Sequence, residues 1–97
     1  MVEYTKQVDW QINSAALQEL VKRGVDVKRL QITSTRGILE IRGTLAFGAA
    51  TIEDLDVMLV FNKLRIIDRT MRGIPYLRDI QWKLLNWKKV GQNWHPA

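Results

Sequence analysis

The sequence predicts a small α+β domain of element order (β)αββαβ, in which a small mixed sheet carries two helices packed on one face. Four segments alternate apolar and polar residues with the period of two typical of half-buried strands, and two others repeat their apolar residues with the period of a helix. Because the strands alternate instead of being apolar throughout, one sheet face should meet the helices and the other should meet water.

The chain has the size of one domain. It contains 97 residues, of which 46% are hydrophobic and none is cysteine. This length is sufficient for a core that folds without disulfides. We therefore expect a single domain over residues 1–97, with its core in residues 4–87 and a flexible tail over residues 88–97.

The first two predicted elements are a short strand and a helix. The strand covers residues 7–12, where apolar side chains occupy every second position. The helix covers residues 15–23, because Asn13 and Ser14 offer N-cap oxygens and Gly24 follows a basic pair as a stop signal. The apolar stripe of this helix consists of Ala16, Leu17, Leu20 and Val21.

A β-hairpin is predicted next. Its strands cover residues 27–35 and 38–47, and Arg36-Gly37 forms a tight turn in which glycine supplies a positive φ. One face of the hairpin is apolar and should point into the core; it carries Leu30, Ile32, Leu39, Ile41, Leu45 and Phe47.

The longest predicted element is a helix over residues 52–72, capped by Thr51. Arg65, Arg69 and Arg72 are spaced i, i+4 and i+7, so they should share an outward face with Asp68. A Gly-Ile-Pro step ends the helix. A last strand follows over residues 77–87, where Ile80, Trp82 and Leu84 alternate toward the core.

The charge of the chain is concentrated in its C-terminal third. The net charge is +5, yet residues 61–97 hold eight Lys and Arg against two Asp. Such a distribution favours an anionic partner, although a solubilising excess of charge would look the same. The tryptophans that interleave with these lysines suit either a lipid headgroup region or nucleic acid. The candidate anion-binding residues are Arg65, Arg69, Arg72, Lys83, Trp87, Lys88 and Lys89.

No catalytic constellation is evident in the sequence. The single histidine, His95, is two residues from the end, and the acidic residues Glu53, Asp54 and Asp56 suit the first turns of a helix. Neither a phosphate-binding loop nor a dinucleotide-binding glycine motif occurs. We therefore expect no enzyme activity, no catalytic residues, no cofactor, no metal ligands and no small-molecule substrate.

From residue 15 to residue 87 the layout resembles a BON domain. That family has an αββαβ core with a strand-glycine-strand segment, here LQITSTRGILEIRGTL with Gly37 and Gly43, and a Gly-Ile step before the closing strand, here RGIPYLRDIQWKLLN. The resemblance implies a non-catalytic module that binds phospholipid or other envelope components, and it transfers no specific site residues.

These observations predict a non-enzymatic interaction module that uses its basic C-terminal third against an anionic phospholipid surface or a protein partner. The alternative is a nucleic-acid-binding domain that uses the same basic and aromatic residues. An exposed strand edge could also pair two copies as a homodimer. The N-terminus shows no secretory signal pattern, so the expected location is the cytoplasm, or outside it if this N-terminus is not the native one.

Overall fold

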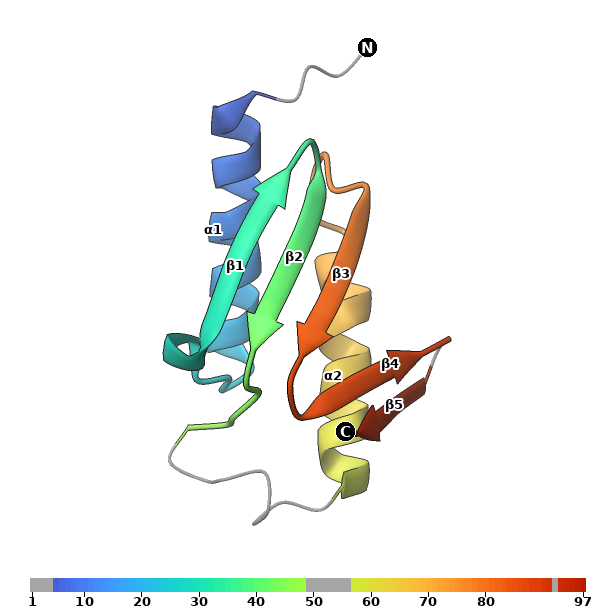
Figure 1. The fold of residues 1–97 in the computed structure, drawn as a ribbon. Helices are drawn as coiled ribbons and strands as arrows, with labels where there is room; N and C mark the ends of the chain where they lie inside the picture. The colour runs from blue at the N-terminus through green and yellow to red at the C-terminus, as the bar shows by residue number, and fades with distance from the viewer. Residues whose placement is uncertain (1–4, 49–56, 92) are drawn as a thin grey trace.

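A computed structural model describes residues 5–48, 57–91 and 93–97 (Figure 1). These residues form two α-helices, one short 3₁₀-helix and five strands. In chain order the elements are α1 (Lys6–Lys22), η1 (Val27–Arg29), β1 (Leu30–Thr35), β2 (Ile38–Gly43), α2 (Val57–Met71), β3 (Asp79–Leu84), β4 (Trp87–Val90) and β5 (Asn93–Pro96).

The main sheet has three strands in the order β1-β2-β3. Strand β2 is central, antiparallel to β1 and parallel to β3. Helix α1 lies behind β1 and α2 lies behind β3, so both helices cover the same face of the sheet (Figure 1). The predicted α+β class, with two helices on one face of a mixed sheet, is confirmed.

The β1–β2 hairpin is confirmed, with strands shorter than predicted. Arg36 and Gly37 form its two-residue turn, with φ angles of 51° and 82°. Two left-handed residues match the twist of the flanking strands, and glycine adopts this conformation without steric cost. The Asp9 carboxylate accepts the backbone N–H groups of both turn residues at 3.2 Å. The predicted core positions Leu39 and Ile41 are fully buried.

The strand predicted over residues 7–12 is wrong, because this segment is the first part of α1. The helix begins after Thr5, whose hydroxyl accepts the Val8 N–H at 3.3 Å and so caps the first turn. Every fourth residue of this helix packs on the core: Val8, Ile12, Ala16 and Leu20. An apolar residue at every fourth position forms one helix face, and this outweighs the short alternation of residues 8, 10 and 12.

The flexible tail predicted over residues 88–97 is also wrong. Strands β4 and β5 form an antiparallel hairpin in a second, two-stranded sheet beside the main one. Its two tryptophans belong to the core: Trp87 is 1% exposed and Trp94 is 3% exposed. Burial of two such large side chains supplies the free energy that orders this short segment.

Helix α2 follows the predicted apolar pattern, and β3 lies within the predicted last strand but ends at Leu84, three residues before the predicted end, because Trp87 begins β4. Val60, Leu64, Ile67 and Met71 of α2 are fully buried against the sheet. The predicted cap Thr51 and the acidic residues around it lie outside the described residues. No helix in the described part of the chain has the length and apolar content needed to cross a bilayer.

Candidate functional site

A basic groove lies between α2 and the β4–β5 hairpin. It has a volume of about 720 Å³ and is open to solvent on one side. The residues that line it are Phe61, Arg65, Asp68, Arg69, Arg72, Lys89, Asn93 and Trp94. We refer to this set as the basic groove.

Three arginines of α2 form one wall of the groove. Arg65, Arg69 and Arg72 are all exposed, as their spacing along the helix predicts. Within the described residues, Arg65 and Arg69 make no ion pair. Their guanidinium groups are therefore available to an anion, and each offers several N–H donors in a planar fork that matches phosphate oxygens.

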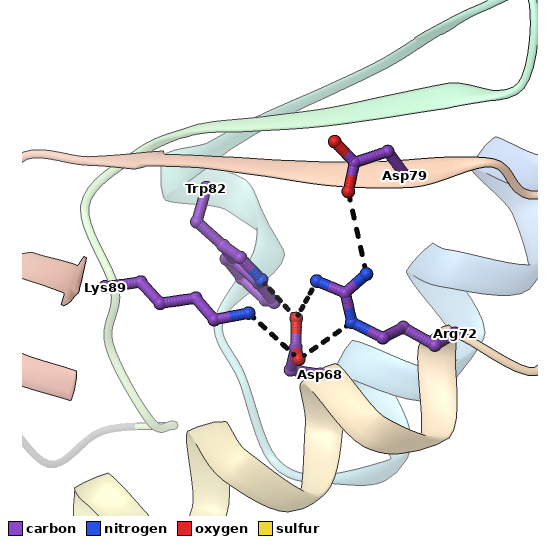
Figure 2. Close-up of polar contacts among 5 residues, drawn as sticks. All are labelled: Asp68, Arg72, Asp79, Trp82 and Lys89. Carbon is purple, nitrogen blue, oxygen red and sulfur yellow. Dashed lines mark hydrogen bonds and ion pairs between the residues drawn. The ribbon is translucent and has the colours of Figure 1, made fainter. Parts of the chain in front are cut away.

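At the base of the groove, the Asp68 carboxylate joins three elements (Figure 2). It accepts hydrogen bonds from Trp82 Nε1 of β3 at 2.8 Å, from Arg72 Nε of its own helix at 3.0 Å, and from Lys89 Nζ of β4 at 3.2 Å. Arg72 also reaches Asp79 at 3.6 Å. The prediction that Asp68 lies on the outward face is wrong, because its side chain points toward β3 and β4 and the residue is only 8% exposed.

The surroundings of Asp68 keep it ionised. Burial raises the pKa of this carboxyl, but the hydrogen bonds from Trp82, Arg72 and Lys89 outweigh burial and hold the pKa below its ordinary value. The hydrogen bond to Asp68 likewise raises the pKa of Arg72. Asp68 therefore carries a full negative charge at neutral pH, and this charge offsets one of the groove's four cations.

Aromatic side chains support the hairpin wall of the groove. Trp82 and Trp94 pack edge to face, with ring centroids 5.1 Å apart. The Lys89 ammonium lies 6.0 Å from the centre of the Trp94 ring, at the outer limit of a cation–π contact. These contacts fix Lys89 between a carboxylate and an indole, so its position does not depend on a ligand.

The seven predicted anion-binding residues divide into three sets. Four of them, Arg65, Arg69, Arg72 and Lys89, line the basic groove. Lys83 lies on the open face of the main sheet, where it pairs with Glu40 at 3.3 Å, and Lys88 is exposed at a β4 position that alternates away from Lys89. Trp87 is buried, so it does not contribute to a binding surface.

The groove also contains residues that sequence reasoning missed as site components. Asp68, Phe61, Asn93 and Trp94 belong to it, and Trp94 lies in the segment predicted to be a flexible tail. The available sequence signal for Trp94 is Gly91, a turn residue that separates two short segments, each with one tryptophan, Trp87 and Trp94. No local signal marks Asp68, because two of its three hydrogen-bond donors come from β3 and β4.

Among the described residues that line the groove, the one carboxylate is Asp68, and its oxygens are occupied by Trp82, Arg72 and Lys89. His95 is exposed in β5 and is not among the groove's lining residues. No group of three His, Cys, Asp or Glu suited to a metal ion occurs among residues 5–48, 57–91 and 93–97. The arrangement can bind anionic oxygens through Arg65 and Arg69, beside Arg72 and Lys89, which Asp68 holds in place.

No protein-family model matches the chain, and comparisons with curated proteins and with solved structures found no match either. The BON resemblance therefore stays a prediction.

Proposed function

We propose that this chain is a non-catalytic binding module that docks its basic groove on the phosphate groups of an anionic lipid surface. The observation that carries the proposal is the pair Arg65 and Arg69. Both line the groove, both are exposed, and neither has an ion-pair partner among the described residues. Exposed cations near an anionic membrane each contribute about 1 kcal/mol to binding.

Apolar side chains beside the arginines favour a membrane over other anionic partners. On α2, Ile66 is 48% exposed next to Arg65, and Met58 is 62% exposed two turns earlier on the arginine stripe. A surface that combines cations with exposed apolar groups suits the boundary between headgroups and acyl chains. The BON resemblance points to the same class of partner.

Nucleic acid is the alternative, because the same cations would bind a phosphate backbone. Binding of single strands normally also uses exposed aromatic rings on which bases stack. In the groove, Trp94 is 3% exposed and Phe61 is only partly exposed. The groove thus offers phosphate contacts without a stacking platform, which favours the lipid surface.

Vesicle co-sedimentation tests the proposal. We expect binding to vesicles that contain anionic phospholipid and no binding to vesicles of neutral phosphatidylcholine. The double variant Arg65→Gln/Arg69→Gln should weaken binding about thirtyfold, which corresponds to the roughly 2 kcal/mol expected for two cations. Added salt should weaken binding of the unmodified chain, because the attraction is screened.

The matched control is Lys22→Gln/Lys28→Gln, which removes the same charge from two exposed lysines at the α1–η1 end of the molecule. This variant should bind nearly as well as the unmodified chain. Equal losses in the two double variants would contradict a role for the groove and indicate a general charge effect. Binding to a fluorescent single-stranded oligonucleotide, without binding to anionic vesicles, would replace the proposal with the nucleic-acid alternative.

A further inference from the structure

The outer edge of β1 is unpaired in the described part of the chain. Strand β1 lies at the end of the main sheet and bonds only to β2. Its six residues, LQITST, include no charge and no proline. Natural proteins usually protect such an edge with charged residues, proline or a bulge, because a free row of N–H and C=O groups readily pairs with another strand.

The register of the hairpin determines which backbone groups face outward. In a two-residue hairpin the pair that flanks the turn exchanges hydrogen bonds, and this pair is Thr35 and Ile38. Hydrogen-bonded and non-hydrogen-bonded pairs then alternate along the ladder. The Thr44 N–H donates to the Arg29 carbonyl at 3.1 Å, so the pair Arg29–Thr44 is hydrogen-bonded, as this alternation requires. The N–H and C=O groups of Leu30, Ile32 and Ser34 therefore point away from β2, and all of them are available at the edge except the Leu30 N–H, which donates to the Val27 carbonyl.

Helix α1 presents an apolar stripe beside this edge. Trp10, Leu17 and Val21 are 67%, 42% and 54% exposed. They lie on a different side of the helix from Ile12, Ala16 and Leu20, which pack on the core. A hollow of about 340 Å³ separates α1 from the edge strand, and its lining includes Trp10, Leu17, Val27, Leu30 and Ile32.

We propose that a second copy of the chain pairs with β1, antiparallel and centred on Ile32. In this register Ile32 lies opposite Ile32 of the second copy, and Leu30 lies opposite Ser34. The register uses the outward groups of both strands, and a two-fold axis perpendicular to the sheet then passes midway between the two Ile32 residues.

The same symmetry explains why the second copy suits the apolar stripe. Paired residues of antiparallel strands point to the same side of a sheet, so this register keeps both α1 helices on one side. The axis then brings two identical stripes of Trp10, Leu17 and Val21 together over the new strand pair. A C2 interface needs a self-complementary patch of this kind, and pairing would also fill the two hollows.

A concentration series in sedimentation velocity tests the association. We expect a monomer–dimer equilibrium for the unmodified chain. Leu17→Lys should raise the dissociation constant about tenfold or more, because each dimer loses two apolar contacts. The matched control is Leu59→Lys, which changes a leucine of similar exposure, 46%, on α2. A chain that stays monomeric throughout, or equal effects of the two variants, would overturn the proposal.

Disulfide trapping tests the register, because the chain has no cysteine of its own. Gln31 and Thr33 of opposite copies would form a non-hydrogen-bonded pair with Cα atoms about 4.5 Å apart, within disulfide range. Like residues would be about 8 Å apart, beyond that range. A mixture of the Gln31→Cys and Thr33→Cys variants should therefore cross-link under oxidation, and neither variant alone should do so. Efficient cross-linking of either variant alone, or none in the mixture, would overturn this register.

Discussion

Replacing Asp68 by asparagine should destabilise the fold through the partners that the carboxylate leaves behind. The asparagine side-chain oxygen can still accept the Trp82 N–H, which lies 2.8 Å from Asp68 Oδ1. The charge that balances Lys89 and Arg72 is lost. The Lys89 side chain is only 20% exposed, so its ammonium would face an uncharged amide with little access to water.

The size of the effect follows from the exposure of each partner. A hydrogen bond between a partly buried ammonium and a carboxylate contributes about 1.5–3 kcal/mol, and this applies to Lys89. Arg72 is 42% exposed and keeps Asp79 as a second partner, so its loss is about 0–1 kcal/mol. We therefore expect Asp68→Asn to lower the free energy of unfolding by about 1.5–4 kcal/mol at neutral pH.

The loss should depend on pH with a definite sign. The folded pKa of Asp68 lies below its ordinary value. The contribution of this carboxylate is then complete above the unfolded pKa of about 3.9 and disappears as the pH falls through the lower folded pKa. The difference in stability between the unmodified chain and Asp68→Asn should accordingly shrink in acid, where the protonated carboxyl resembles the amide.

Urea unfolding followed by tryptophan fluorescence measures this difference. With a slope of roughly 1 kcal/mol per molar urea, the midpoint should fall by about 1.5–4 M. The matched control is Glu40→Gln, which removes a carboxylate that also pairs with two cations, Arg42 and Lys83, but on the open face of the sheet. The control should lose much less stability than Asp68→Asn, because solvent screens exposed ion pairs. Equal losses for both variants, or a gap that persists at acidic pH, would refute the reasoning.

Two further substitutions test the packing of the fold by the same urea assay. Trp94→Ala should destabilise by about 3–5 kcal/mol because it empties a buried site, whereas His95→Ala on the exposed side of β5 should have little effect; equal effects would mean that the hairpin does not pack on α2. Gly43→Ala should lower the free energy of unfolding several times more than Gly91→Ala. Gly43 has φ +118° and an added Cβ would lie 2.2 Å from the Arg29 carbonyl oxygen, whereas Gly91 has φ +61° and open space around it. Similar losses of stability in the two variants would contradict the close approach of Gly43 to Arg29.

The sequence was sufficient to predict elements whose signals are local. The hairpin is one of these elements, because its turn at Arg36 and Gly37 lies directly between the two alternating segments that form its strands. The periodicity of α2 places its arginine stripe correctly for the same reason. The strand prediction for residues 7–12 is wrong because Val8 and Ile12 fit two patterns equally well: a strand with a period of two, and a helix with apolar residues four apart. The cue that distinguishes the two is Thr5, whose hydroxyl caps the first turn of the helix.

The site could be predicted only in part, because it depends on contacts between distant segments. Arg65, Arg69 and Arg72 share a helix face, so their grouping follows from spacing alone. Lys89 joins them because β4 and β5 fold back as a hairpin, and these short, mostly polar segments carry no strong strand pattern. Asp68 is buried because Trp82 and Lys89 hydrogen-bond to it from other elements. The spacing of residues along the helix, taken without the other elements, predicts that Asp68 faces solvent.

The placement of both helices on one face of the main sheet has a consequence for avidity. A two-fold axis perpendicular to the sheet keeps each face on its own side, so pairing of two chains at β1 would leave both copies of α2, and with them both basic grooves, facing the same way. The outer strands of the joined six-stranded sheet would lie about 24 Å apart. Once one groove is bound to a flat anionic surface, the other is held close to it at high effective concentration. Weak binding by each chain would then be sufficient for firm attachment of the pair.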